Sequence, residues 1–137
     1  MQRIVVAAKA GTEEPWLADA AADLAEQTGA GLSVVSVDGL DVEMGSTMPR
    51  SEYTAMARAA AEGVAARIRE AGREVEAQVR PGKVAPGVLL FAEEQDADLI
   101  LVGASARGPV AKRVLGDVSL ELVSRSRRPV MVIAPPG

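Results

Sequence analysis

The sequence predicts an α/β fold, a three-layer sandwich in which a five-stranded parallel sheet lies between two layers of helices. Three observations carry this prediction. Five apolar segments of strand-like composition recur along the chain, helical patterns separate them, and most of the 48% hydrophobic content is Ala, Val and Leu, which suit helix-on-sheet packing. Parallel neighbours need crossover connections, and these turn right-handed almost without exception. The length of 137 residues predicts a single domain over residues 1–137.

The strands and helices follow from the spacing of apolar residues. The predicted strands are Arg3 to Ala8, Leu32 to Val37, Glu74 to Arg80, Leu99 to Val102 and Val130 to Ala134. The predicted buried helix faces are formed by Leu17, Ala20, Ala21 and Leu24, then Met56, Ala60, Val64 and Ile68, then Val88 and Ala92, and finally Leu115, Val118 and Leu122.

The ends of the first helix have chemical signals. Thr12 is expected to cap it, Glu13 and Glu14 favour the positive end of its dipole, and Pro15 is tolerated in its first turn. Gly29 can adopt the left-handed conformation that stops a helix.

The second helix is expected to start near Ser51 and to end at Gly72. The segment before it, Asp38 to Arg50, is interpreted as a surface loop, close to the length at which ordinary connections become uncommon. The sequence does not assign a role to this loop.

Composition excludes several classes of function. The chain has no Cys and no His, so it lacks a thiol nucleophile, the commonest general base and the commonest metal ligand. We therefore predict no catalytic residue and no metal site. One Trp, one Tyr, one Phe and a net charge of −4 argue against nucleic-acid binding. The absence of a signal-type segment and of a membrane-length apolar run predicts a cytoplasmic location without a membrane partner.

The candidate ligand site is expected at one edge of the sheet. In open α/β sheets, ligands bind beyond the carboxyl ends of the strands, where the strand order reverses. The relevant loops follow Ala8, Val37, Arg80 and Val102. A buried-strand run ends at Gly103, small residues follow, and Gly116 opens the next helical pattern, whose free amides favour an anion.

Several segments resemble one protein family. They are IVVAA at 4–8, ADLILVG at 97–103, RGPVA at 107–111, LGDVS at 115–119 and RPVMVI at 128–133. On these segments the chain resembles the universal stress protein family over nearly its whole length. The resemblance implies a flavodoxin-like or adenine nucleotide alpha hydrolase-like sheet of order 3-2-1-4-5, a dimer, and a stress-linked regulatory role. Nucleotide-binding members carry Gly-x-x-Gly, nine residues, then Gly-Ser or Gly-Thr.

Carried over by this resemblance, the nucleotide site is altered at three positions. The first family glycine is Gly103, the second is replaced by Ala106, and the spacing then reaches Gly116 with Asp117 in place of the hydroxyl. The family acid after the first strand is matched by Lys9. Ala106 adds a methyl group where the backbone meets phosphate, and Asp117 replaces a donor with an acceptor-only charge. We expect weakened phosphate binding.

The remaining positions implied by the resemblance contact a ligand through their backbone, which survives substitution. They are Val37, lining the adenine pocket, with Val102 and Val118 beside the two glycines. Arg107 follows in the glycine-containing loop and could reach a phosphate.

Each candidate also has a purely structural interpretation. Gly103 and Gly116 can serve as simple turn glycines, and Asp117 as an acid that caps a helix. Lys9 is either a solvated loop cation or an anion ligand, and Arg107 can be merely solvated. A basic cluster near the C-terminus, formed by Arg125, Arg127 and Arg128, is interpreted as complementing the carboxyl end of the last helix.

Two functions remain in view. The first is a noncatalytic regulatory, stress-response domain with a degraded adenine-nucleotide site and no cofactor. The second is a stress protein that still binds ATP or another adenine nucleotide, with weak or no hydrolysis, using Lys9 or Arg107 to offset Asp117. Under both, the apolar segment Val130 to Ala134 is predicted to form an edge strand that pairs with a second copy, giving a homodimer.

Overall fold

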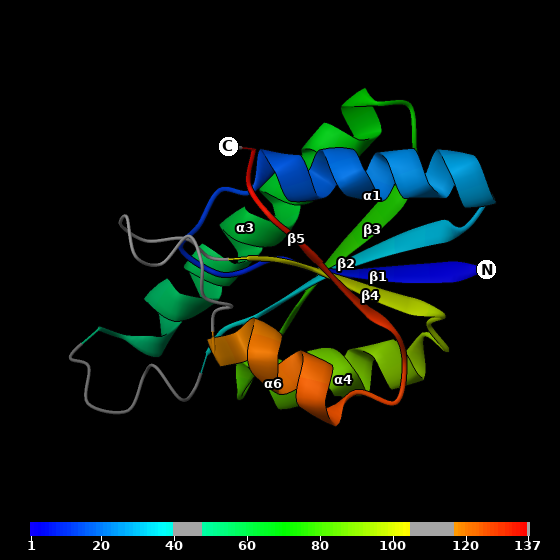
Figure 1. The fold of residues 1–137 in the computed structure, drawn as a ribbon. Coiled ribbons are helices and arrows are strands. Elements are labelled where there is room, and N and C mark those ends of the chain that lie inside the picture. Colours follow the sequence, from blue (N-terminus) through cyan, green and yellow to red (C-terminus); the bar gives the residue numbers. More distant parts are fainter. Residues whose placement is uncertain (40–47, 105–116, 137) are drawn as a thin grey trace.

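The computed structural model describes residues 1–39, 48–104 and 117–136. Its centre is a five-stranded sheet in the order β3-β2-β1-β4-β5, with every described pair parallel (Figure 1). The predicted strand order is therefore confirmed. The strands are β1 (Arg3–Ala7), β2 (Gly31–Val37), β3 (Val75–Arg80), β4 (Leu99–Gly103) and β5 (Val130–Ile133).

Helices cover both faces of the sheet, as the three-layer prediction requires (Figure 1). One layer contains α1 (Pro15–Thr28) and α3 (Arg50–Glu70), and the other contains α4 (Val84–Glu94) and α6 (Asp117–Arg125). Because side chains alternate along a strand, β1 supplies both cores. Ile4 and Val6 pack with α1 and α3, while Val5 and Ala7 pack with α4 and α6.

The sequence located most element ends to within a residue or two, and Gly29 caps α1 in the left-handed conformation with φ 75°. The predicted cap at Thr12 is wrong. Glu14 occupies the cap position of α1 without a side-chain cap bond, and the Thr12 hydroxyl instead donates to the Lys9 carbonyl oxygen at 2.8 Å. The prediction of a buried Met56 also fails, since this residue on α3 is 37% exposed.

The carboxylate of Asp38 connects the start of α3 with the ends of β2 and β3. Asp38 directly follows β2 and is 4% exposed. Its carboxylate accepts from the Gly82 backbone amide at 3.0 Å and pairs with Arg50 at 3.0 Å. Most of the predicted Asp38 to Arg50 loop, residues 40–47, lies outside the described part of the chain.

Within the described residues, no helix is both long and apolar enough to cross a membrane.

Candidate functional site

The strand order reverses between β1 and β4, and the carboxyl ends of these two strands hold the candidate site. Lys9 lies two residues beyond β1, and Gly103 is the last residue of β4. Helix α6 begins at Asp117 and places Ser119 in its first turn. The structure thus brings Lys9 and Gly103 together at the carboxyl ends of β1 and β4.

The Lys9 side chain crosses from the end of β1 to the end of β4. Its ammonium donates to the Gly103 carbonyl oxygen at 2.7 Å and to the Ser119 hydroxyl oxygen at 3.4 Å. Ser119 is fully buried, and its own hydroxyl lies 3.3 Å from the same Gly103 carbonyl. Lys9 is therefore no solvated loop cation. It links the first strand, the fourth strand and the last helix.

Glu14 forms the opposite side of this cluster. The residue is 5% exposed, and its carboxylate accepts from the Lys9 backbone amide and the Thr12 hydroxyl, both at 3.4 Å. The carboxylate also packs against the α-carbon of Gly103, where a β-carbon would overlap it. Position 103 therefore requires glycine, because a side chain there would displace the buried carboxylate of Glu14.

Burial opposes the charges of both groups. The pKa of Lys9 is lowered, chiefly by burial, with the nearby Glu14 charge acting in the other direction. The pKa of Glu14 is raised by burial, and this rise is opposed by the Lys9 charge and by the hydrogen bonds from Lys9 and Thr12. The two residues therefore depend on each other for their charged states.

The three valines of the predicted site contribute side chains to the core. Val37 and Val102 are almost fully buried, and Val118 packs against the same cluster on the α4 and α6 face. The side chains of Val37 and Val102 are therefore withdrawn from a ligand at the sheet edge, whereas Val118 is only partly buried. Val37 also sits directly beneath Gly87 of α4, where a β-carbon would lie 2.8 Å from the valine side chain.

The structure does not describe the side chains of four predicted site residues. Ala106, Arg107 and Gly116 lie outside the described residues, and Asp117 is described only as the first residue of α6. The structure therefore tests neither the altered second glycine nor the acid in place of a hydroxyl.

Sequence reasoning missed Glu14, Ser119 and Asp38. Glu14 carried a misleading signal, because an acid before Pro15 is expected to favour the helix dipole from the surface. Ser119 was visible only as part of the LGDVS segment. Asp38 could have been found, since an acid immediately after a buried strand lies at the edge where sites form.

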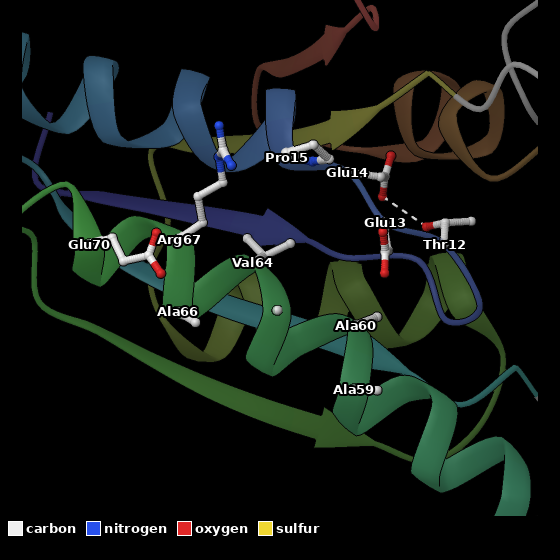
Figure 2. Close-up of a pocket in the computed structure, with 11 residues that line it drawn as sticks. Thr12, Glu13, Glu14, Pro15, Ala59, Ala60, Val64, Ala66, Arg67 and Glu70 are labelled. Atoms are coloured by element: carbon white, nitrogen blue, oxygen red, sulfur yellow. Dashed lines mark hydrogen bonds between the residues drawn. The ribbon is translucent and has the colours of Figure 1, made fainter.

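A pocket of about 410 Å³ lies beside this cluster, between the start of α1 and the outer surface of α3 (Figure 2). Thr12, Glu13 and Glu14 stand at one end, and Arg67 and Glu70 stand at the other (Figure 2). The Arg67 guanidinium is held by Asp19 of α1 at 2.7 Å, so the pocket has no free cation from that residue.

Chemically, the described residues at this edge combine one ammonium group, one carboxylate and the hydroxyls of Thr12 and Ser119. They contain no group of three or more His, Cys, Asp or Glu side chains arranged to hold a metal ion. Glu14, with its raised pKa, faces Lys9 and Gly103, and its carboxylate accepts from the Thr12 hydroxyl at 3.4 Å. What the cluster offers a ligand is one ammonium group at the carboxyl edge of the sheet.

A five-stranded parallel sheet in the order 3-2-1-4-5, covered by helices on both faces, defines an open α/β protein, and such proteins bind ligands where the strand order reverses. The profile of the universal stress protein family matches residues 1–134, and the chain belongs to that family. A comparison with curated protein sequences finds no significant match.

Solved structures agree with this assignment. A universal stress protein from Archaeoglobus fulgidus is 27% identical, with a TM-score of 0.77 over 97% of this chain and 98% of the other. A universal stress protein in complex with cAMP is 22% identical, with a TM-score of 0.72 over 98% of both chains. Another A. fulgidus structure, in complex with dAMP, is 24% identical, with a TM-score of 0.72 over 97% of this chain and 98% of the other. The latter two show the shared fold.

Proposed function

We propose that this chain is a noncatalytic regulatory domain of the universal stress protein family whose adenine-nucleotide site is remodelled, so that ATP binds weakly. The observation that carries the proposal is the Lys9 ammonium, bonded at 2.7 Å to the carbonyl oxygen of Gly103, the first glycine of the family motif. The Lys9 side chain thus already occupies the Gly103 carbonyl oxygen and joins the ends of β1 and β4. A ligand at this edge would have to bind beside it.

The charge balance of the cluster supports weak binding of a polyphosphate. One buried carboxylate, Glu14, accompanies the single ammonium of Lys9. Like charges close together in a buried site are costly, so a ligand with several negative charges gains little from a cation that is already paired. The altered positions Ala106 and Asp117 act in the same direction on sequence grounds.

The alternative is a stress protein that retains an adenine nucleotide. Its support is the pair of structural neighbours in complex with cAMP and dAMP, each of which has a single phosphate. In this case Lys9 would act as a point-charge contact to the phosphate. Hydrolysis is not part of this proposal, because the described residues offer no activated nucleophile or base.

Calorimetry decides between the two. We expect ATP with magnesium to bind the unmodified protein with a Kd no tighter than about 0.1–1 mM, a range that corresponds to roughly −5 to −4 kcal/mol. The triple variant Lys9→Asp, Ala106→Gly, Asp117→Ser should bind more tightly. Lys83→Asp is the matched control, because Lys83 is an exposed lysine before α4. Tight, saturable ATP binding by the unmodified protein would contradict the proposal, and tight binding of cAMP or dAMP alone would favour the alternative.

We further propose that the chain forms a homodimer through β5. Among the described residues this strand pairs only with β4, and its outer row of backbone groups needs a partner. Apolar side chains flank that edge: Met131 of β5 is 40% exposed, and Leu120 and Val123 of α6 are 55% and 47% exposed. A second copy related by a two-fold axis would cover them.

Light scattering should report twice the mass of one chain. Met131→Lys is expected to shift the protein toward monomer, and Val132→Pro should impair both assembly and folding by removing a strand donor. Leu90→Lys is the control, since Leu90 is more exposed than Met131, at 56%, but lies on α4. A monomer at micromolar concentration with an ordered fifth strand would refute this mode of assembly. The cytoplasmic location stays a prediction from the sequence.

A further inference from the structure

The end of the sheet opposite the candidate nucleotide site holds a second pocket, of about 660 Å³. It lies where α4 ends, where β4 begins and where α6 turns into β5. Its buried floor is apolar and consists of Ala92, Ala97 and Ile100. Its polar wall is the segment Arg125, Ser126, Arg127 and Arg128. The pocket therefore combines an apolar base with a concentration of guanidinium groups.

Arg128 is fixed in position by the backbone around it. Its Nε donates to the Ala97 carbonyl oxygen at 2.7 Å, so this arginine does not complement the end of α6 as the sequence suggested. The turn that carries it is closed by Ser126, whose hydroxyl donates to the Arg128 carbonyl at 2.8 Å and accepts from the Arg128 amide at 3.0 Å. A guanidinium held in this way loses little further freedom when it binds a ligand.

The other charges of the pocket are only loosely engaged. Asp96 approaches Arg128 at 3.8 Å, and its side chain is fully exposed, so this ion pair contributes little. Arg127 is exposed and makes no hydrogen bond or ion pair with a described residue. Arg125 is the exception, because Glu121 holds it at 2.7 Å. Two of the three guanidinium groups thus keep donors available.

We propose that this pocket binds a small organic oxyanion, a phosphate monoester or a carboxylate with an apolar substituent. The terminal nitrogens of Arg128 and the free Arg127 match the two-oxygen geometry of such a group. The solvated carboxylate of Asp96 lies beside Arg128. The anionic group of the ligand would displace it and take its position. Ala92, Ala97 and Ile100 receive the apolar part.

The same pocket disfavours ligands of high negative charge. Glu93 and Asp96 also line the pocket, so it holds two carboxylates as well as Arg127 and Arg128. A single oxyanion can displace Asp96 from Arg128, whereas a polyanion would meet both acids. The site is therefore not a nucleic-acid surface, in agreement with the low aromatic content and negative charge of the chain.

Titration of the isotopically labelled protein with phenyl phosphate, followed by amide NMR, tests this proposal. We expect saturable shifts at Ala97 and at Ser126 to Arg128, with a millimolar Kd. Inorganic phosphate should bind more weakly because it leaves the apolar floor empty, and benzoate should compete. Sodium chloride at matched ionic strength is the control for unspecific screening.

Three variants test which charged groups of the pocket bind or oppose the ligand. Arg127→Gln should weaken binding at least fivefold, and because Arg127 is exposed and unpaired this change leaves the fold intact. Arg58→Gln, at an exposed arginine of α3, should have no effect. Asp96→Asn should tighten binding about twofold to fivefold by removing the competing carboxylate, since such exposed pairs are worth about 0.2–1 kcal/mol. Asn also tolerates the left-handed backbone at Asp96, with φ 51°.

Three outcomes would overturn the inference. These are no shift at the four amides up to solubility, shifts that sodium chloride reproduces, and equal affinity in the Arg127→Gln and Arg58→Gln variants. The result does not depend on the ATP site, because Asp96, Arg127 and the four reporter amides lie at the other end of the sheet.

Discussion

The two ends of the sheet hold charges in opposite ways. At the carboxyl end, Lys9 and Glu14 are shielded from water. The Lys9 ammonium donates to the Gly103 carbonyl oxygen, and the Glu14 carboxylate accepts from the Lys9 backbone amide. At the amino end, Arg127 and Asp96 are exposed, and the ion pair of Asp96 with Arg128 is stretched to 3.8 Å. Among the described residues, the charged groups at the amino end are thus more accessible to a ligand than Lys9 and Glu14 are.

Charge near a strand end therefore does not by itself indicate a ligand site. Removing one member of a buried charge pair leaves the other uncompensated, which costs several times what a surface pair contributes. We therefore expect changes at the carboxyl end to alter folding, and changes at the amino end to alter binding with little effect on folding.

The largest effect is expected for Gly103→Ala. The new methyl group would occupy the position of the Glu14 carboxylate, which would have to leave the cluster around Lys9. Overpacking of this kind typically costs about 1–3 kcal/mol in the free energy of unfolding. Urea denaturation measures it.

Two further variants identify the cause. In a Glu14→Ala background, Gly103→Ala should cost clearly less, because the colliding group is gone. Gly63→Ala is the matched control, since this helical glycine of α3 has open space around it, and the change should be stabilising by up to about 1 kcal/mol. Equal costs of Gly103→Ala in both backgrounds would show that the carboxylate does not set the requirement for glycine.

Next in size is Lys9→Met, which keeps the length of the side chain and removes its charge. The variant loses the bonds to Gly103 and Ser119 and leaves Glu14 buried without its counter-charge. We expect a loss of about 1–3 kcal/mol. The exposed Lys83, changed to Met, should alter the unfolding free energy by less than about 0.5 kcal/mol. Similar values for the two variants would mean that Lys9 behaves as a surface residue.

The strands could be predicted from the sequence, whereas the inward orientation of Glu14 could not. Periodicity located all five strands and, with the family resemblance, their order, because alternation of apolar residues is a property of each segment alone. It could not tell that Glu14 turns inward, since that depends on Gly103, which is almost ninety residues away and leaves space for the carboxylate. For the same reason Thr12 looked like a cap, whereas its hydroxyl is used by the Lys9 carbonyl.

The pH dependence of stability gives a third test of the carboxyl end. Because burial raises the pKa of Glu14, the folded protein binds this proton more tightly than the unfolded chain does. The resulting stabilisation is complete below the ordinary pKa of 4.5 and is lost as the pH rises through the raised value. Relative to Glu14→Gln, the unmodified protein should therefore gain stability on acidification, by at most about 1.4 kcal/mol per pH unit.

Urea denaturation of both proteins between neutral pH and the onset of acid unfolding measures this difference. A matched comparison with Glu26→Gln, at an exposed acid of α1, controls for the general charge of the protein. A constant difference between the unmodified protein and Glu14→Gln over the whole range would show that Glu14 titrates as it does in the unfolded chain.

The smallest effect is expected at the amino end, for Asp96→Asn. The ion pair with Arg128 is long and solvated, and the backbone of Asp96 has φ 51°, which Asn adopts as readily as Asp. The free energy of unfolding should change by less than about 0.5 kcal/mol. Asp96→Ala removes the same charge but fits the left-handed backbone poorly, and it should cost about 1 kcal/mol. If both variants lose stability equally, the charge of Asp96 supports the fold, and the contrast between the two ends of the sheet disappears.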